Sequence, residues 1–197
     1  MIIKRIYNFI KRWTPLPSQI YKMQEALGRI EQRQTAQASG FRESEFRVFS
    51  QWGEDGIIQF LLQHVPIKRP LFIEFGVENY IESNTRFLLT NNQWSGIVID
   101  GSDENIEYIK RDPIYWAANL KAVSAFITKD NINELITQNG ITGDIGILSI
   151  DIDGNDYWVW KAIDCVSPSI IICEYNSLFG PVAEVTTPYD PAFVRDT

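Results

Sequence analysis

The sequence predicts an α/β fold built on a parallel β-sheet, and three observations support that prediction. Short apolar runs alternate with amphipathic segments of helical periodicity from about residue 50 to residue 173. Four of these runs end in an acidic residue. The turn after the first run contains a glycine, Gly76, where a strand would pass into a helix. This alternation is typical of parallel strands joined by right-handed crossovers, with helices on both faces of the sheet.

The order of the elements follows from the same periodicities. The apolar runs predict strands at 71–75, 95–100, 120–127, 145–150 and 169–173. The amphipathic stretches predict helices at 57–65, 84–90, 103–110, 130–138 and 155–163. Asp103 would cap the third of these helices, and Asp130 or Asn131 would begin the fourth.

The chain divides at about residue 40 into a helical extension, residues 1–40, and an α/β domain, residues 41–197. Within residues 2–13, apolar and basic side chains fall on opposite helical faces, which is typical of contact with a membrane surface or a partner chain. Residues 18–37 predict a second helix with a narrow apolar stripe, which favours a short coiled coil or a linker helix.

Composition restricts the function. The chain has 197 residues, of which 45% are hydrophobic and 22% charged, as in ordinary globular proteins. The formal net charge of −7 argues against binding the backbone of nucleic acids. Cys165 and Cys173 are expected to pack as small apolar side chains in a reducing compartment, so we expect a cytoplasmic protein. No apolar run is long enough to cross a membrane.

The acids at the strand ends are the candidate binding residues, because ligands of open α/β sheets bind at the carboxyl edge. Gly76 would let a ligand approach the backbone closely, and Glu74 would direct an acceptor at ligand hydroxyls or an amine. Asp100, at the end of the second strand, is placed to accept hydrogen bonds from a ribose diol. Each acid taken alone is better explained as a solvated loop residue or a helix cap, and the binding interpretation rests on four such acids at corresponding strand ends.

Five short motifs between residues 50 and 190 resemble class I S-adenosylmethionine-dependent methyltransferases, and more narrowly the FkbM-like family. They are Ser-Gln-Trp-Gly-Glu-Asp-Gly (50–56), Phe-Ile-Glu-Phe-Gly-Val (72–77), Val-Ile-Asp-Gly (98–101), Leu-Ser-Ile-Asp-Ile-Asp-Gly-Asn-Asp-Tyr (148–157) and Cys-Glu-Tyr-Asn (173–176). The resemblance implies a Rossmann-like domain that binds S-adenosylmethionine. The cofactor-binding residues that it implies are Glu74, Gly76, Asp100, Gly101, Ala125, Asp130 and Asp151.

The loop 151–156 has several interpretations. An EF-hand is excluded because Asp156 stands at position six and Ala162 at position twelve of the loop. The Asp-x-Asp pair also fits the metal–nucleotide clamp of a glycosyltransferase. A third interpretation is the metal loop of cation-dependent O-methyltransferases, with a Mg²⁺, Ca²⁺ or Mn²⁺ ligand set of Asp151, Asp153, Glu174 and Asn176. The simplest is that Asp153 and Asn155 cap the following helix.

A carboxylate is the expected general base, because the only histidine, His64, is predicted near the end of a helix. Asp151 and Asp55 are the candidates. The sequence thus predicts methyl transfer to an oxygen of a sugar or another small hydroxylated acceptor. The alternatives are a metal-dependent glycosyltransferase and a non-catalytic module of the same fold.

Two further expectations concern partners and the end of the chain. The basic, apolar pattern of residues 2–13 suggests peripheral contact with the inner face of a membrane or with a partner, and the chain is a candidate homo-oligomer. After Asn176 the sequence shows no pattern for the antiparallel strand pair that usually ends a class I methyltransferase sheet.

Overall fold

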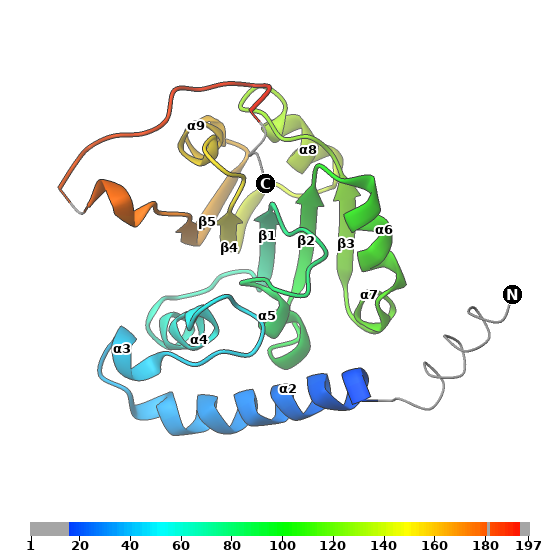
Figure 1. The fold of residues 1–197 in the computed structure, drawn as a ribbon, viewed down its shortest axis with the longest axis vertical. Coiled ribbons are helices and arrows are strands. Elements are labelled where there is room, and N and C mark those ends of the chain that lie inside the picture. Colours follow the sequence, from blue (N-terminus) through cyan, green and yellow to red (C-terminus); the bar gives the residue numbers. More distant parts are fainter. Residues whose placement is uncertain (1–15, 181, 194–197) are drawn as a thin grey trace, which may run out of the picture.

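The computed structural model describes residues 16–180 and 182–193, and it confirms the predicted α/β fold (Figure 1). Five strands form one sheet in the order β3-β2-β1-β4-β5, and every neighbouring pair is parallel. The strands are β1 (Leu71–Phe75), β2 (Ser95–Asp100), β3 (Leu120–Ser124), β4 (Gly143–Ile150) and β5 (Val166–Cys173). The strand order reverses between β1 and β4, and open parallel sheets bind their ligands at such a reversal.

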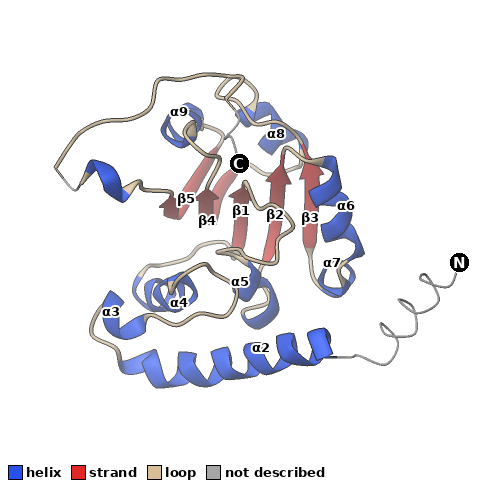
Figure 2. Ribbon diagram, in the orientation of Figure 1, coloured by secondary structure: helices blue, strands red, loops and turns tan. Residues whose placement is uncertain are grey.

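Helices cover both faces of the sheet (Figure 2). One face carries α4 (Glu54–His64), α5 (Arg86–Asn91), α6 (Asp103–Arg111) and α7 (Pro113–Ala117). The other face carries α8 (Ile132–Gln138) and α9 (Asp156–Ala162). Because both faces are covered, β1 is buried along its whole length, which explains why its sequence is a continuous apolar run rather than an alternating one.

The N-terminal helix α2 (Leu16–Gln34) packs against α4 and α5, away from the sheet (Figure 1). Gly28 allows α2 to approach the loop before α4 and helix α5 closely, because a Cβ built there would lie 2.3 Å from Cγ2 of Val48 and 3.2 Å from the Phe87 ring. A small apolar cluster of Phe46, Val48, Phe49 and Phe87 lies beneath the helix, with Tyr21 packed against it. Thus α2 is attached to the domain, through the short elements η1 (Thr35–Gln37) and α3 (Phe41–Ser44).

Some sequence predictions of element ends were wrong in detail. The third strand ends at Ser124 rather than residue 127, and α7 was not predicted. Ser102, not Asp103, caps α6, and its side chain accepts a hydrogen bond from the Asn105 amide. Asp112 caps α7 in the same way, with Pro113 at the first helical position. The prediction missed α7 because it is a single turn, too short for a periodicity to show.

The ends of the chain bear on several expectations. The predicted helix at residues 2–13 lies outside the described residues. After β5 the described residues contain the short helix η2 (Ser177–Phe179) and no further strand. In the described part of the chain, no helix has the length and apolar character needed to cross a membrane. Cys165 and Cys173 are free thiols packed beside the apolar core, as predicted.

Candidate functional site

A cavity of about 1100 Å³ lies at the carboxyl ends of the strands. Its wall includes the ends of β1, β2, β4 and β5 and the loops that follow them. Of the residues predicted to bind a cofactor, Glu74, Gly76, Asp100, Gly101, Ala125 and Asp151 line this one cavity. The fold therefore brings together acids that are far apart in sequence, as expected for parallel strand ends at a point where the strand order reverses.

Gly76 forms the turn directly after β1, at the cavity wall. Its φ is +68°, a conformation that side chains other than glycine rarely adopt. A Cβ at this position would lie 1.5 Å from the carbonyl oxygen of Asp151, so β1 and β4 approach each other too closely there for any side chain. The group that approaches this glycine closely is the neighbouring strand end. The close approach of a ligand to Gly76 stays a prediction.

Glu74 has a different role from the one expected. It is 4% exposed, and its carboxylate accepts hydrogen bonds from the Ser83 hydroxyl (2.7 Å), the Asn84 amide (2.9 Å), and both the amide and the hydroxyl of Thr85. Burial raises the pKa of Glu74, while these hydrogen bonds lower it. The carboxylate thus fixes loop 83–85 at the cavity wall rather than directing a free acceptor at a ligand.

Asp100 lines the cavity, and one oxygen of its carboxylate can still accept a hydrogen bond from a ligand. Oδ1 accepts hydrogen bonds from the Ser102 amide (2.9 Å) and the Asn105 side chain (3.1 Å), and Oδ2 accepts one from the Glu78 amide (2.8 Å). A carboxylate oxygen has two lone pairs, so Oδ2 can accept one further hydrogen bond. The three internal bonds hold the carboxylate rigidly, which suits recognition of a hydroxyl.

The loop after β3 contributes to the cavity, but only in part as predicted. Ala125 lines the cavity and donates its amide to the Asp100 carbonyl oxygen (2.9 Å). The neighbouring Phe126 also lines the cavity and is half exposed. Asp130 does not line it, because its exposed carboxylate lies beyond the loop and pairs with Lys129 at 3.0 Å. Its predicted place beside an adenine is therefore wrong for this structure.

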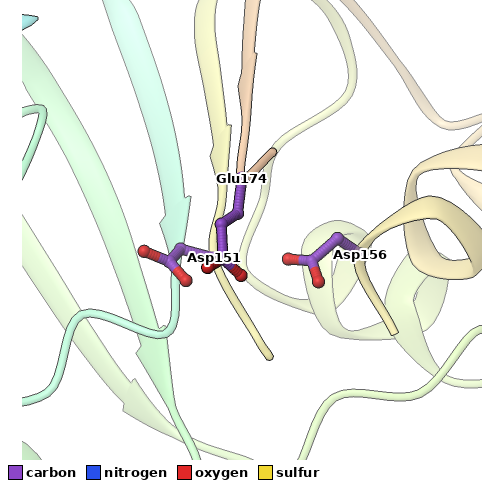
Figure 3. A group of neighbouring side chains, drawn as sticks. All are labelled: Asp151, Asp156 and Glu174. Atoms are coloured by element: carbon purple, nitrogen blue, oxygen red, sulfur yellow. The ribbon is translucent and has the colours of Figure 1, made fainter. Parts of the chain in front are cut away.

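Three acids form a compact cluster at the ends of β4 and β5 (Figure 3). Asp151, Asp156 and Glu174 each offer a carboxylate oxygen, and these oxygens lie within 4.8 Å of one another. Asp156 is held by the Ile152 and Gly154 amides, each 2.9 Å from one of its oxygens. Oxygen donors of this kind fit Mg²⁺, Ca²⁺ or Mn²⁺.

The cluster differs from the ligand set that the sequence predicted. Asp153 lines the cavity with a φ of +52° but does not belong to the cluster, where Asp156 takes its place. Asn176 lies outside the cavity wall, because its side-chain oxygen accepts the Leu178 amide and begins η2. Asn155 stands at the start of α9 as predicted, but its side chain makes no capping hydrogen bond to that helix.

The surroundings of Asp151 change its acidity. The pKa of Asp151 is raised to about 7. Partial burial is the largest cause, and the negative charges of Glu174, Asp156, Asp153 and Glu74 follow in that order. A carboxylate of this pKa can take up a proton near neutral pH. Burial also raises the pKa of the neighbouring Cys173 thiol to about 11, so this side chain remains protonated and is a poor nucleophile.

Asp55, the second candidate base, is not part of the cavity wall. It is almost fully buried, and its Oδ2 accepts the amides of Val48, Phe49 and Ser50 at 2.7–2.8 Å and the Ser50 hydroxyl at 2.9 Å. Asp55 thus fixes the segment that leads into α4. In this structure it is a buried anchor for backbone amides, and the prediction that it acts as a base is wrong.

The cavity wall is strongly acidic. Eight of its residues are acids, and none of the described residues that line it is a lysine, arginine or histidine. The acids are Glu54, Glu74, Glu78, Glu82, Asp100, Asp151, Asp153 and Glu174. Four exposed aromatic side chains also line it: Trp52, Phe126, Tyr175 and Phe193. Such a wall favours a ligand that carries positive charge together with flat or apolar groups, and disfavours a bare phosphate.

Sequence reasoning missed the part of the wall that comes from the end of the chain. The segment 182–193 returns over α9 (Figure 1), where the Asn155 side chain donates to the Asp190 carbonyl oxygen (2.8 Å) and accepts from its amide (3.3 Å). The Trp158 indole donates to the Thr187 carbonyl oxygen at 2.9 Å. These bonds bring Phe193 to the cavity, and no local pattern in the sequence signals them.

We compared the sequence with protein-family models and with curated proteins. No protein-family model matches the chain, and no curated protein matches it. The inferences about function therefore rest on the cavity itself.

Proposed function

We propose that this protein is an S-adenosylmethionine-dependent methyltransferase that methylates an oxygen of a sugar or another small hydroxylated acceptor. The observation that carries the proposal is the cavity where the strand order reverses. At this place Asp100, held rigidly at the end of β2, faces a cavity whose described lining residues include no basic side chain. S-adenosylmethionine has a ribose and two cationic groups, the sulfonium and the ammonium. A nucleoside phosphate would instead call for basic side chains or a helix N-terminus with a glycine-rich loop.

The binding mode follows from the residues on the wall. Oδ2 of Asp100 would accept a ribose hydroxyl, and the backbone at Gly76 and Gly101 would approach the donor closely. Phe126, exposed beside Ala125, offers a flat apolar surface for the adenine. The sulfonium would then lie toward the acids at the ends of β4 and β5, whose negative charge favours it.

In the transfer step, the acceptor oxygen attacks the sulfonium methyl carbon. The carbon–sulfur bond breaks, its electron pair goes to sulfur, and the product is a neutral thioether. The hydroxyl proton passes to the Asp151 carboxylate, whose pKa of about 7 suits a general base at neutral pH. The methyl group is already activated, so most of the rate enhancement would come from alignment of the two substrates.

A divalent cation fits the chemistry of the same wall. Asp151, Asp156 and Glu174 would hold it, since all three offer oxygen ligands within one small volume. When bound, such a cation lowers the pKa of an acceptor hydroxyl. In that form Asp151 would act as a ligand, and its role in accepting the proton would be reduced.

Titration calorimetry with the whole chain tests the proposal. We expect S-adenosylmethionine to bind, and Asp100→Ala to weaken binding by about tenfold or more, as for loss of a hydrogen bond to a charged group. Asp130→Ala is the matched control, because it removes an acid from the next strand's loop that does not line the cavity. Absence of S-adenosylmethionine binding by the folded wild type would refute the proposal.

Two other functions give different results in the same experiment. The acidic cluster would also suit a metal-dependent glycosyltransferase, for which a nucleotide sugar binds only with Mn²⁺. A non-catalytic module of this fold would bind neither ligand. The exposed aromatic side chains around the cavity favour an acceptor such as a sugar ring, and hence an enzyme, over this last alternative.

The location and partners of the protein are proposals of the same kind. The basic and apolar pattern of residues 2–13 supports contact with the inner face of a membrane or with a partner chain. The free cysteines and the absence of a disulfide among the described residues agree with the reducing conditions of the cytoplasm.

A further inference from the structure

The segment 187–193 connects two sides of the cavity (Figure 1). At one end, the Thr187 carbonyl oxygen accepts the indole N–H of Trp158 in α9, at 2.9 Å. Two residues later, the ring of Tyr189 lies 5.1 Å from Nζ of Lys129, in the loop after β3. The segment therefore runs from α9 to the loop after β3, and we call it the strap.

A tight turn in the strap directs Phe193 to the cavity. The Phe193 amide donates to the Asp190 carbonyl oxygen at 3.1 Å, with Pro191 at the second position of the turn, where its fixed φ is favourable. The Asp190 carboxylate accepts the Ala192 amide at 2.9 Å. Asn155, at the start of α9, binds both the amide and the carbonyl of Asp190. The ring of Phe193 is thus presented to the cavity by a turn whose own conformation is fixed.

Phe193 and Phe126 are two partly exposed rings that line the same cavity, and they are 39% and 48% exposed. Each ring packs on the backbone of a loop glycine. A Cβ built on Gly154 would lie 3.2 Å from Cε1 of Phe193, and one built on Gly101 would lie 3.5 Å from Cδ2 of Phe126. Gly101 follows β2 and Gly154 follows β4, so the two rings pack on loops at either side of the end of β1.

The spacing of the strands sets the distance between these two loops. Only β1 separates β2 from β4, and neighbouring strands lie about 4.8 Å apart, so the two strand ends are roughly 10 Å apart. A flat ring stacked between two aromatic rings needs about 7–8 Å, because carbon atoms in contact are about 3.5–4.0 Å apart. The space between Phe126 and Phe193 therefore suits one flat ring.

The position of this space identifies the ring, on the basis of the function proposed above. Asp100 would bind the ribose of the donor, and Phe126 packs on the very next residue, so the base attached to that ribose would lie beside Phe126. The acceptor would instead approach the methyl group near the acids at the ends of β4 and β5. We therefore propose that the strap is the outer wall of the adenine site. Phe193 is then a donor-binding residue, which stacks on the face of the base away from Phe126.

The strap is built to open as well as to close. Within 182–193, all of which the structure describes, no residue belongs to a helix or a strand, and residues 182–188 are exposed. A segment held by a few side chains opens at a small cost in free energy. A donor that stacks on Phe193 binds the closed strap more tightly than the open one, so it shifts the strap toward closure. The product carries the same adenosine, and its release therefore also requires the strap to open.

Hydrogen exchange on the full-length chain tests this coupling. Exchange at residues 187–193 should slow about fivefold when S-adenosylmethionine or S-adenosylhomocysteine is saturating, as expected for one aromatic stacking contact. Methionine, which lacks the adenosine, should leave exchange in the strap unchanged. The wild type alone is needed for this measurement, so its outcome does not depend on whether a variant folds.

Titration calorimetry on variants measures the same contact from the side of the ligand. Phe193→Ala should weaken binding of both adenosine compounds about fivefold, a factor similar to the slowing of exchange, because the two effects share one coupling free energy. Phe193→Trp, which keeps a flat ring, should bind within about twofold of the wild type. Phe179→Ala is the matched control, since Phe179 is also an exposed ring after β5 but does not line the cavity.

The results that contradict the inference are distinct from those that contradict the proposed function. A folded wild type that binds neither adenosine compound would overturn both. Binding by the wild type that is unchanged in Phe193→Ala would overturn the inference alone, and so would equal losses in Phe193→Ala and Phe179→Ala. Strap exchange that does not slow when S-adenosylmethionine is bound, or that slows equally with methionine, would likewise show that the strap does not cover the adenine.

Discussion

Among the residues that line the cavity, Gly76 is the one whose replacement should lower the stability of the protein most. Its φ is positive, and the Asp151 carbonyl oxygen lies 1.5 Å from the place that a Cβ would take, so both features act against any side chain. We predict that Gly76→Ala lowers the free energy of unfolding by about 2–4 kcal/mol, because the strand ends must separate as well as adopt a strained φ. Chemical denaturation measures this loss.

Gly140→Ala provides the matched control for this prediction. Gly140 also has a positive φ, of +79°, but a Cβ there would meet no atom within 4 Å. Only the conformational cost of about 1 kcal/mol should appear in this variant. Equal losses in the two variants would show that the contact between β1 and β4 is not tight in solution.

Asp151 should make stability depend on pH. Its pKa in the folded protein is about 7, against an ordinary value of 3.8, so the folded state binds a proton more tightly than the unfolded state. Its contribution to stability therefore falls as pH rises from about 4 to about 7, and then stays constant. We predict that Asp151→Asn gains stability relative to the wild type when pH is raised from about 5 to about 8.

Thermal unfolding of both proteins at the two pH values measures this difference. Asp130→Asn, which removes an exposed acid outside the cavity, should follow the wild type. If Asp151→Asn and the wild type lose or gain stability in parallel, the carboxylate does not titrate in this range. The same proton should compete with cations, so binding of Mn²⁺ should strengthen as pH rises through about 7.

At the scale of elements, the chain segment 182–193 depends on α9 for its position. Asn155 binds both the amide and the carbonyl of Asp190, and Asn155 itself is buried. We predict that Asn155→Ala lowers stability by about 1–2 kcal/mol and frees the segment that carries Phe193. Hydrogen exchange at residues 187–193 should become about tenfold faster, while the strands keep their protection.

Asn139→Ala is a suitable comparison for this variant. The Asn139 side chain also donates one hydrogen bond to a main-chain oxygen, that of Leu135, on the far end of α8. Its loss should leave exchange in the segment unchanged. Unchanged exchange in Asn155→Ala as well would mean that the segment is held mainly by other contacts, such as the Trp158 indole to Thr187 bond.

The sequence predicted the strands well because the central ones are buried on both faces and therefore read as apolar runs. It also placed Asp100 and Asp151 correctly, since parallel strand ends share one edge. It could not assign the partners of the acids. Glu74, Asp55 and Asp156 each bind backbone amides of a nearby loop, and only the fold shows that these carboxylates anchor loops.

Other site residues were predicted wrongly for the same reason, because their positions depend on how the loops fold. Asp156 joins the acidic cluster because the turn at Asp153 and Gly154, both with positive φ, folds the loop back on itself. Asn176 and Asp130 look like ligands in sequence, yet each is used locally, one in a turn and one in a surface ion pair. Phe193 reaches the cavity from another part of the chain, so its role depends on tertiary contacts alone.

At the scale of the whole molecule, charge is unevenly distributed. Residues 1–34 contain seven basic and two acidic residues and so carry a charge of +5, which leaves −12 on the remaining residues for a total of −7. Much of that negative charge surrounds the cavity. The resulting potential favours cationic ligands and repels anionic ones, and it falls off with ionic strength.

This potential predicts how salt affects the proposed methyl donor and its product. S-adenosylmethionine carries a sulfonium charge that the thioether product, S-adenosylhomocysteine, lacks, and the two are otherwise nearly alike. We predict that raising salt from about 0.1 M to about 1 M weakens donor binding about fivefold more than product binding, because the screening length falls from about 10 Å to about 3 Å. Calorimetry with each compound at both salt concentrations measures this ratio.

Two variants test whether the acidic cluster causes the difference in salt dependence. Glu174→Gln should reduce the difference, since it removes one of the acids nearest the proposed sulfonium position. Asp144→Asn, which changes an exposed acid paired with Lys68, should leave the difference unchanged. An equal salt dependence for the two compounds in the wild type would place the sulfonium away from the acidic cluster, and with it the proposed site of methyl transfer.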